Sequence, residues 1–87
     1  MITVEDIKQR ITSGIEGADV MVRLDGNKCL VAVGSPAFEG KRPVQKQQMI
    51  YACLNELIAS GDLHAVSMQT YTPSQWQSQE KLGFPGF

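Results

Sequence analysis

The stretch ADVMVRLDGNKCLVAVG, residues 18–34, decides the fold class. Val20, Val22 and Leu24 occupy alternate positions, which is the pattern of a strand buried on one face. The Asp-Gly-Asn-Lys that follows has the turn chemistry of a tight hairpin. From Cys29 onward the stretch is apolar, which is typical of a central strand covered on both faces. We therefore predict a β-hairpin with strands at 18–25 and 28–34.

An apolar stripe precedes this hairpin. Ile7, Ile11 and Ile15 recur every four residues, as in a short amphipathic helix packed on a core. Thr3 stands where a helix N-cap would, with an acidic side chain three residues later. We predict a helix that begins after Thr3 and ends in the glycine-containing stretch 14–17.

A longer helix follows the hairpin. Ser35 and Pro36 first predict a single helical turn before Gly40, because serine caps helices and proline fits the first helical position. The next helix is predicted to begin at Pro43 and to end at Gly61. Its apolar residues recur at the spacing of a helix packed on a sheet, namely Ile50, Cys53, Leu54, Leu57 and Ile58.

The last strand is predicted at 64–71, and Thr72 and Pro73 open a final helix that Trp76 packs onto the body. The tail, residues 80–87, contains glycine and proline and is a candidate for disorder. Because the third strand follows a helix, it must enter the sheet by a crossover. The order αββ(α)αβα thus predicts an α+β, class II KH-like fold with a three-stranded mixed sheet, in a single domain over 1–87.

Composition limits the kind of protein. With 87 residues and 43% apolar side chains, the chain suits one folded domain rather than a disordered segment. No apolar run approaches the roughly 18 residues of a membrane span, and the first residues lack a secretory pattern. We expect a cytoplasmic protein with reduced thiols and no membrane contact. A net charge of −1 leaves nucleic-acid binding to a local patch.

Three stretches occur in an order that resembles the BolA-like family. They are VGSPAFEGK at 33–41, QKQQMIY at 45–51, and LHAVSMQTYTPSQW at 63–76. The resemblance extends over residues 4–83. Within the family, the Lys-Gln-Gln at 46–48 and the His-Ala-Val-Ser at 64–67 are similar to the IbaG (YrbA) branch. The resemblance supports the BolA-like version of the fold.

What the resemblance implies is a partner rather than a reaction. BolA-like proteins pair with monothiol glutaredoxins of the CGFS type and share a bridging [2Fe–2S] cluster, with glutathione supplying one thiolate. The expected function is a non-enzymatic adaptor in iron–sulfur trafficking or in the response to iron or acid stress. We find no Ser-His-Asp set, no phosphate-binding glycine loop and no paired carboxylates that would indicate an enzyme.

His64 is the only histidine. A neutral imidazole can bind iron through a ring nitrogen. From spacing alone, the simpler interpretation of His64 is a solvated residue in the loop that precedes a strand. Its place in the His-Ala-Val stretch implies, by resemblance, that it is a cluster ligand. One histidine and two cysteines cannot enclose a two-iron cluster, so a partner must complete it and the isolated chain holds none.

The second ligand is open. Family members often place His or Cys near the start of the second strand, where this chain has Lys28 followed by Cys29. Adjacent strand residues point to opposite faces, so Cys29 is either a buried core residue or a ligand that a register shift of the hairpin exposes. Cys53 lies on the apolar stripe of its helix and is predicted to be core.

Lys41, Arg42 and Lys46 form a basic segment within a stretch, 40–55, that lacks acidic residues. Such a segment is either a solvated face or a docking surface for an acidic partner, glutathione carboxylates or a phosphate backbone. The alternative function is a nucleic-acid-binding transcriptional regulator of the BolA type. The loop at 38–41 has only one of the two glycines of a KH clamp, which predicts weak, salt-dependent contact. The edge strand and the basic segment also offer surfaces for a homodimer.

Overall fold

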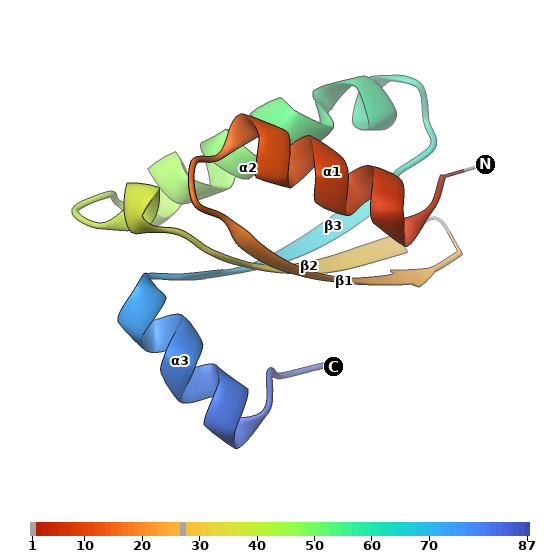
Figure 1. Ribbon diagram of the computed structural model, residues 1–87. Coiled ribbons are helices and arrows are strands. Elements are labelled where there is room, and N and C mark those ends of the chain that lie inside the picture. The colour runs from red at the N-terminus through yellow and green to blue at the C-terminus, as the bar shows by residue number, and fades with distance from the viewer. Residues whose placement is uncertain (1, 27) are drawn as a thin grey trace.

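The computed structural model describes residues 2–26 and 28–87 (Figure 1). In chain order the elements are α1 (Val4–Gly14), β1 (Asp19–Asp25), β2 (Lys28–Gly34), the 3-10 turn η1 (Pro36–Phe38), α2 (Pro43–Ala59), β3 (Ala65–Tyr71) and α3 (Pro73–Leu82). Each predicted helix and strand is present, with bounds within a residue or two of the prediction. The conformation predicted for Asn27 in the hairpin turn lies outside the described residues.

The three strands form one sheet in the order β1-β2-β3. β1 and β2 are antiparallel, with Asp25 opposite Lys28 at the hairpin end. β2 and β3 are parallel, and Lys28 is opposite Ala65 at the same end of the sheet. The crossover through α2 makes this parallel pairing, so the predicted mixed sheet and the central place of β2 are confirmed.

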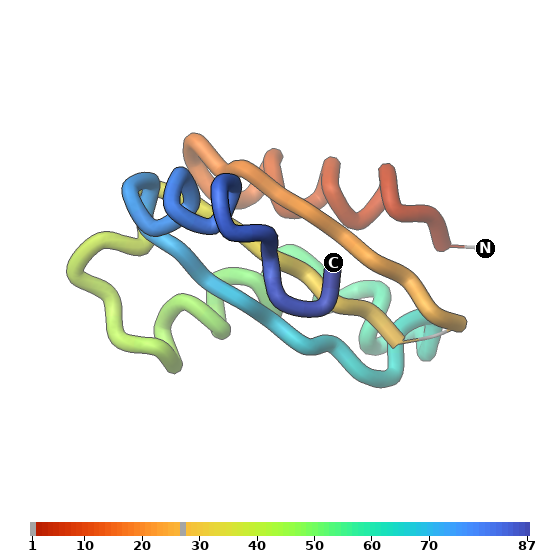
Figure 2. Tube along the Cα trace, turned by 90° about the horizontal axis from the view of Figure 1, so that it is seen from below, coloured from red at the N-terminus to blue at the C-terminus, as the bar shows by residue number. Residues whose placement is uncertain are grey.

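The helices cover the sheet unequally (Figures 1 and 2). α1 and α2 lie side by side on one face, whereas α3 and the C-terminal residues lie on the other. The main core fills the space between α1, α2 and the sheet. Its fully buried side chains include Ile7, Ile11, Val31, Val33, Phe38, Ile50 and Leu54. None of the helices in the described part of the chain is long and apolar enough to cross a membrane.

The turn after β2 places an aromatic ring in this core. The Ser35 hydroxyl donates a hydrogen bond to the Glu16 carbonyl at 2.6 Å and accepts one from the Ala37 N–H at 3.0 Å. Ser35 itself is buried, so both bonds are shielded from water. Phe38 follows in the same turn and is fully buried. The serine therefore ties this turn to the turn that follows α1 and fixes where Phe38 enters the core.

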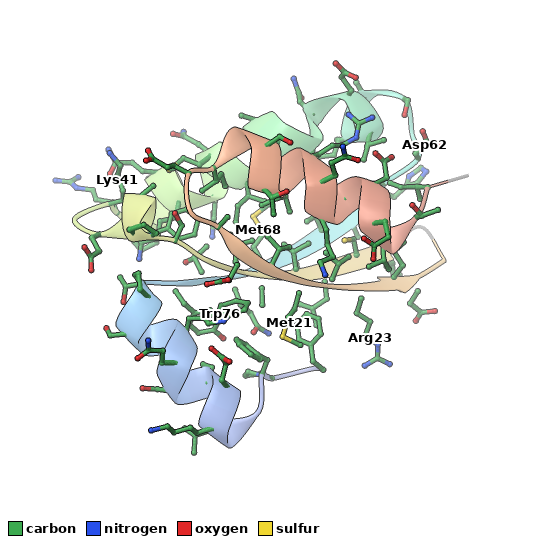
Figure 3. All side chains as sticks on the ribbon, in the orientation of Figure 1. Met21, Arg23, Lys41, Asp62, Met68 and Trp76 are labelled. Atoms are coloured by element: carbon green, nitrogen blue, oxygen red, sulfur yellow. The ribbon has the colours of Figure 1, made fainter. Side chains whose placement is uncertain are left out.

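α3 is held by an aromatic cluster on the opposite face (Figure 3). Trp76 packs directly on Gly34, where a Cβ atom would stand 2.7 Å from the indole ring. The ring centroid of Phe84 lies 4.5 Å from that of Trp76 and 5.7 Å from that of Tyr71. Glycine at position 34 is thus required by the close approach of Trp76.

The last residues also contact the sheet. Helix α3 extends to Leu82, so it includes the first part of the segment considered a candidate for disorder. Beyond it, the Arg23 guanidinium donates to the Gly86 carbonyl at 2.8 Å. The Gln69 amide donates to the Pro85 carbonyl at 2.6 Å. The glycine and proline residues of the tail made disorder a candidate, but local sequence could not show that Arg23 and Gln69 would bind its backbone carbonyls.

Candidate functional site

His64 lies in the short connection between α2 and β3 and is exposed. On one side it is preceded by Leu63, which is buried and whose N–H donates to the Leu57 carbonyl at 3.1 Å. On the other side it is followed by Ala65, the first residue paired in β3. The backbone of His64 is therefore anchored before and after, while its imidazole faces solvent.

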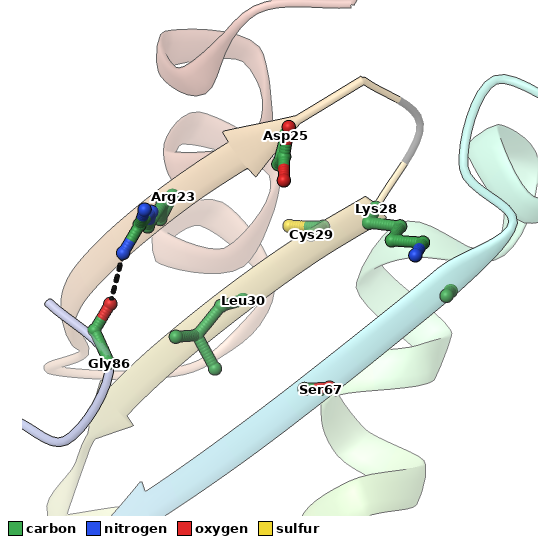
Figure 4. Close-up of a pocket in the computed structure, with 8 residues that line it drawn as sticks. Arg23, Asp25, Lys28, Cys29, Leu30, Ser67 and Gly86 are labelled. Atoms are coloured by element: carbon green, nitrogen blue, oxygen red, sulfur yellow. Dashed lines mark hydrogen bonds between the residues drawn. The ribbon is translucent and has the colours of Figure 1, made fainter.

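An open groove of about 330 Å³ lies beside this position, at the hairpin end of the sheet (Figure 4). Its lining includes Arg23, Asp25 and Lys28 from the hairpin and Ala65 and Ser67 from β3. The groove thus surrounds the start of β3 with both positive and negative side chains. Sequence reasoning did not identify this groove, because its lining depends on the registers between β1, β2 and β3, which local patterns do not give.

Cys29 lies in the main core. Its side chain is 4% exposed and belongs to the same buried cluster as Val31 and Phe38. Burial raises the pKa of the Cys29 thiol to about 11. Since iron binds the thiolate, burial and the raised pKa both disfavour ligation in this arrangement. The geometry favours the core interpretation over the ligand interpretation, which would require the register of the hairpin to change.

The buried thiol should react slowly. A pKa of about 11 instead of 9.0 leaves about one hundredth of the usual thiolate at pH 8. We expect iodoacetamide to modify Cys53, which is only partly buried, well before Cys29 in the folded protein. Both should react at similar rates in urea. Peptide mass spectrometry at timed intervals checks this, and equal rates in the folded protein would place Cys29 at the surface.

Cys53 packs where α1 meets α2. Its sulfur would stand 2.5 Å from a Cβ atom at Gly14, and its thiol donates to the Met49 carbonyl at 3.3 Å. Burial raises the pKa of this thiol as well. In the described residues, no three His, Cys, Asp or Glu side chains are grouped so that they could hold a metal ion. His64, Cys29 and Cys53 are therefore not brought together as one ligand set.

The basic segment lies far from His64. Lys41 and Arg42 are exposed just before α2, whereas His64 follows the other end of that helix. The 17 residues of α2 span about 25 Å. Figure 3 shows Lys41 and Asp62, two residues before His64, at opposite ends of the molecule. The structure thus separates the two predicted surfaces, and one small ligand cannot contact both.

These features define a class. The chain is a small α+β domain with an αββαβα order, a mixed sheet, no grouped metal ligands in the described residues, and one exposed imidazole fixed at the start of the parallel edge strand. Such a domain presents one exposed imidazole on an ordered support, and its described residues form no enclosed group of metal ligands.

Comparisons with known proteins agree with this class. The sequence profile of the BolA-like protein family matches residues 25–75. The acid stress protein IbaG of Escherichia coli K12 is 35% identical over 77 residues, which cover 88% of this chain and 92% of that protein. A protein in the rpoN-murA intergenic region of Acinetobacter guillouiae is 35% identical over 79 residues, or 91% and 95% of the two chains. A bolA protein homologue from Coxiella burnetii has a similar structure, with a TM-score of 0.77, 35% identity, and coverage of 88% of this chain and 99% of that chain.

The chain belongs to the BolA-like family. Its similarity to IbaG extends over most of its length, which confirms the branch that the stretches at 46–48 and 64–67 indicated.

Proposed function

We propose that this protein is a non-enzymatic adaptor that binds a monothiol glutaredoxin and contributes His64 to a [2Fe–2S] cluster shared between the two proteins. Glutathione on the glutaredoxin side supplies one thiolate of that cluster. The observation that carries the proposal is the setting of His64, whose imidazole is exposed although its backbone is anchored on both sides.

The donor set of this chain fits a shared cluster better than a resident one. A two-iron cluster takes four ligands. Both cysteines are wholly or partly buried, and burial raises the pKa of each thiol. His64 is then the ligand that a docking protein can reach, and the remaining ligands must come from outside the chain. When bound, the cluster would supply electron-transfer or iron–sulfur donor chemistry.

The residues around His64 give the docking surface a defined shape. The loop before it is closed by the Ser60 hydroxyl, which donates to the Asp62 carboxylate at 2.8 Å. The groove after it presents the cation of Lys28 and the carboxylate of Asp25. The groove charges can attract a partner of complementary charge, and the anchored backbone of His64 holds the imidazole in place, because a ligand on an ordered support loses little conformational entropy on binding.

Reconstitution tests the adaptor directly. The protein is mixed with a CGFS-type monothiol glutaredoxin, iron, sulfide and glutathione under anaerobic conditions. The expected product is a 1:1 complex whose visible absorption and circular dichroism differ from those of the glutaredoxin alone. Two separate proteins on gel filtration, with the glutaredoxin spectrum unchanged, would refute the proposal.

A second candidate function, nucleic-acid binding, is supported by the other end of α2. None of Lys41, Arg42 and Lys46 forms an ion pair within residues 2–26 and 28–87. They surround the N-terminal end of the helix, where the helix dipole adds positive potential and no acidic side chain occurs in the first turn. That end can contact a phosphate backbone, although three cations support only weak binding.

Charge reversal at Lys41 separates the two functions. In a gel-shift assay at physiological salt, Lys41→Glu should weaken any nucleic-acid binding several-fold and lower its salt dependence by at least about one phosphate contact. The same variant should form the glutaredoxin complex normally, because Lys41 is about 25 Å from His64 along α2. Lys81→Glu on α3 is the matched control. Equal losses in both variants would mean that the basic segment is only a solvated face.

A further inference from the structure

The edge of the sheet formed by β3 is open and unusually unprotected (Figure 2). Among the described residues β3 pairs only with β2, so the hydrogen-bonding groups along its outer edge have no strand partner. The strand reads AVSMQTY and contains no charged residue and no proline. The opposite edge, β1, carries Asp19, Arg23 and Asp25. Charges of that kind are what discourages one edge strand from pairing with another.

An apolar stripe on α2 runs along the same side. Two contacts show which side of α2 faces α1. Cys53 of α2 packs on Gly14 of α1, and Glu56 of α2 forms an ion pair with Arg10 of α1 at 3.5 Å. Val44, Tyr51 and Ile58, seven residues apart, lie on the other side of the helix, beyond β3.

Two residues of this stripe, Val44 and Tyr51, are poorly covered, whereas Ile58 is partly buried against the core. Val44 is 55% exposed and Tyr51 is 45% exposed, and they are two of the four large apolar side chains most exposed in the described residues. Beneath the stripe, Val66 and Met68 of β3 are only partly buried, whereas Val31 and Val33 of the central strand are fully buried. Strand edge and helix stripe therefore form one continuous, incompletely covered surface.

We propose that this surface is the interface of a homodimer in which β3 pairs antiparallel with β3 of a second copy. A two-fold axis perpendicular to the sheet would join two three-stranded sheets into one of six strands. It would place the two α2 helices on the same face, side by side and antiparallel. This inference does not depend on the proposed cluster function.

Three observations favour a second copy over a single extended peptide. A peptide strand would satisfy the β3 edge but would leave the stripe of Val44 and Tyr51 uncovered, whereas a second copy covers both. The uncharged β3 can meet itself without like-charge repulsion. Antiparallel α2 helices also bring the basic end at Lys41 and Arg42 toward the partner's opposite end, which carries the exposed Asp62.

Sedimentation of the full chain over a range of concentrations tests the dimer. The expected result is a monomer at low concentration that converts to a species of twice the mass. Tyr51→Lys should raise the dissociation constant at least about tenfold, because each substitution occurs twice in a two-fold interface. Leu82→Lys is the matched control, since Leu82 is 80% exposed on α3, away from the interface, and this variant should dimerise normally.

Hydrogen exchange locates the contact. Amides of β3 should become more protected as the concentration rises, and those of β1 should not. A chain that stays monomeric at the highest soluble concentration overturns the proposal and leaves the edge to an extended segment of another protein. A dimer that Tyr51→Lys does not weaken, or that Leu82→Lys weakens equally, also overturns it. Circular dichroism confirms that both variants fold.

Discussion

Replacing His64 with alanine is expected to abolish the spectral change that this protein causes when it joins a cluster-loaded glutaredoxin. Metal sites lose about 10- to 100-fold in affinity when even a hydrogen-bond partner of a ligand is removed, so loss of the ligand itself should cost at least as much. The folding of the chain should be unaffected, because His64 is exposed and Leu63 anchors its loop independently. Visible circular dichroism during titration of the glutaredoxin measures the effect.

Ser67→Ala is the matched control for this variant. Ser67 is exposed on β3, three residues after His64, and lines the groove beside it, but its hydroxyl is a poor iron ligand. It should give the wild-type spectrum. If His64→Ala retains that spectrum as well, the imidazole is not a ligand, even if the two proteins still associate.

Replacing Phe38 with alanine is expected to lower the free energy of unfolding by about 3–5 kcal/mol. The ring is fully buried, and the turn that carries it is tied down by Ser35, so the surrounding core cannot easily close the cavity. Small domains have total stabilities of about 5–15 kcal/mol, so this variant should be close to unfolded at 37 °C. Urea denaturation followed by circular dichroism gives the value.

Leu82→Ala provides the comparison for Phe38→Ala. It also shortens a large apolar side chain, but Leu82 is 80% exposed, and the expected change is within about 0.5 kcal/mol. A loss below about 1 kcal/mol for Phe38→Ala would show that the turn after β2 does not help to form the core.

The order of the elements could be predicted because the local sequence signals for helix starts and strands agree with the connections that the sheet requires. The Ser35-Pro36 pair and the Thr72-Pro73 pair each mark a helix start that the structure confirms. The helix between the second and third strands required a crossover, and the crossover required a parallel pair. For Cys29 the alternation of faces along β2 left two interpretations, a buried core residue or a ligand, and in the structure its side chain is 4% exposed.

The surroundings of His64 could not be predicted, because they depend on distant pairings. The sequence indicated the imidazole but not that Lys28 lies opposite Ala65, the residue after His64, since that follows from the parallel register. It also indicated the basic segment as a candidate surface, without showing where that segment lies relative to His64. Only the length and direction of α2 show that they lie at opposite ends of the domain.

The central claim is that one imidazole of this chain binds iron in the shared cluster. Because His64 is the only histidine, growth with histidine labelled with ¹⁵N in the imidazole ring labels that ring alone, while the glutaredoxin stays unlabelled. Pulsed electron paramagnetic resonance of the reduced complex should then show a strongly coupled ¹⁵N nucleus, replaced by ¹⁴N in an unlabelled sample. A reduced complex whose spectrum lacks any coupled nitrogen from the labelled chain would contradict the claim.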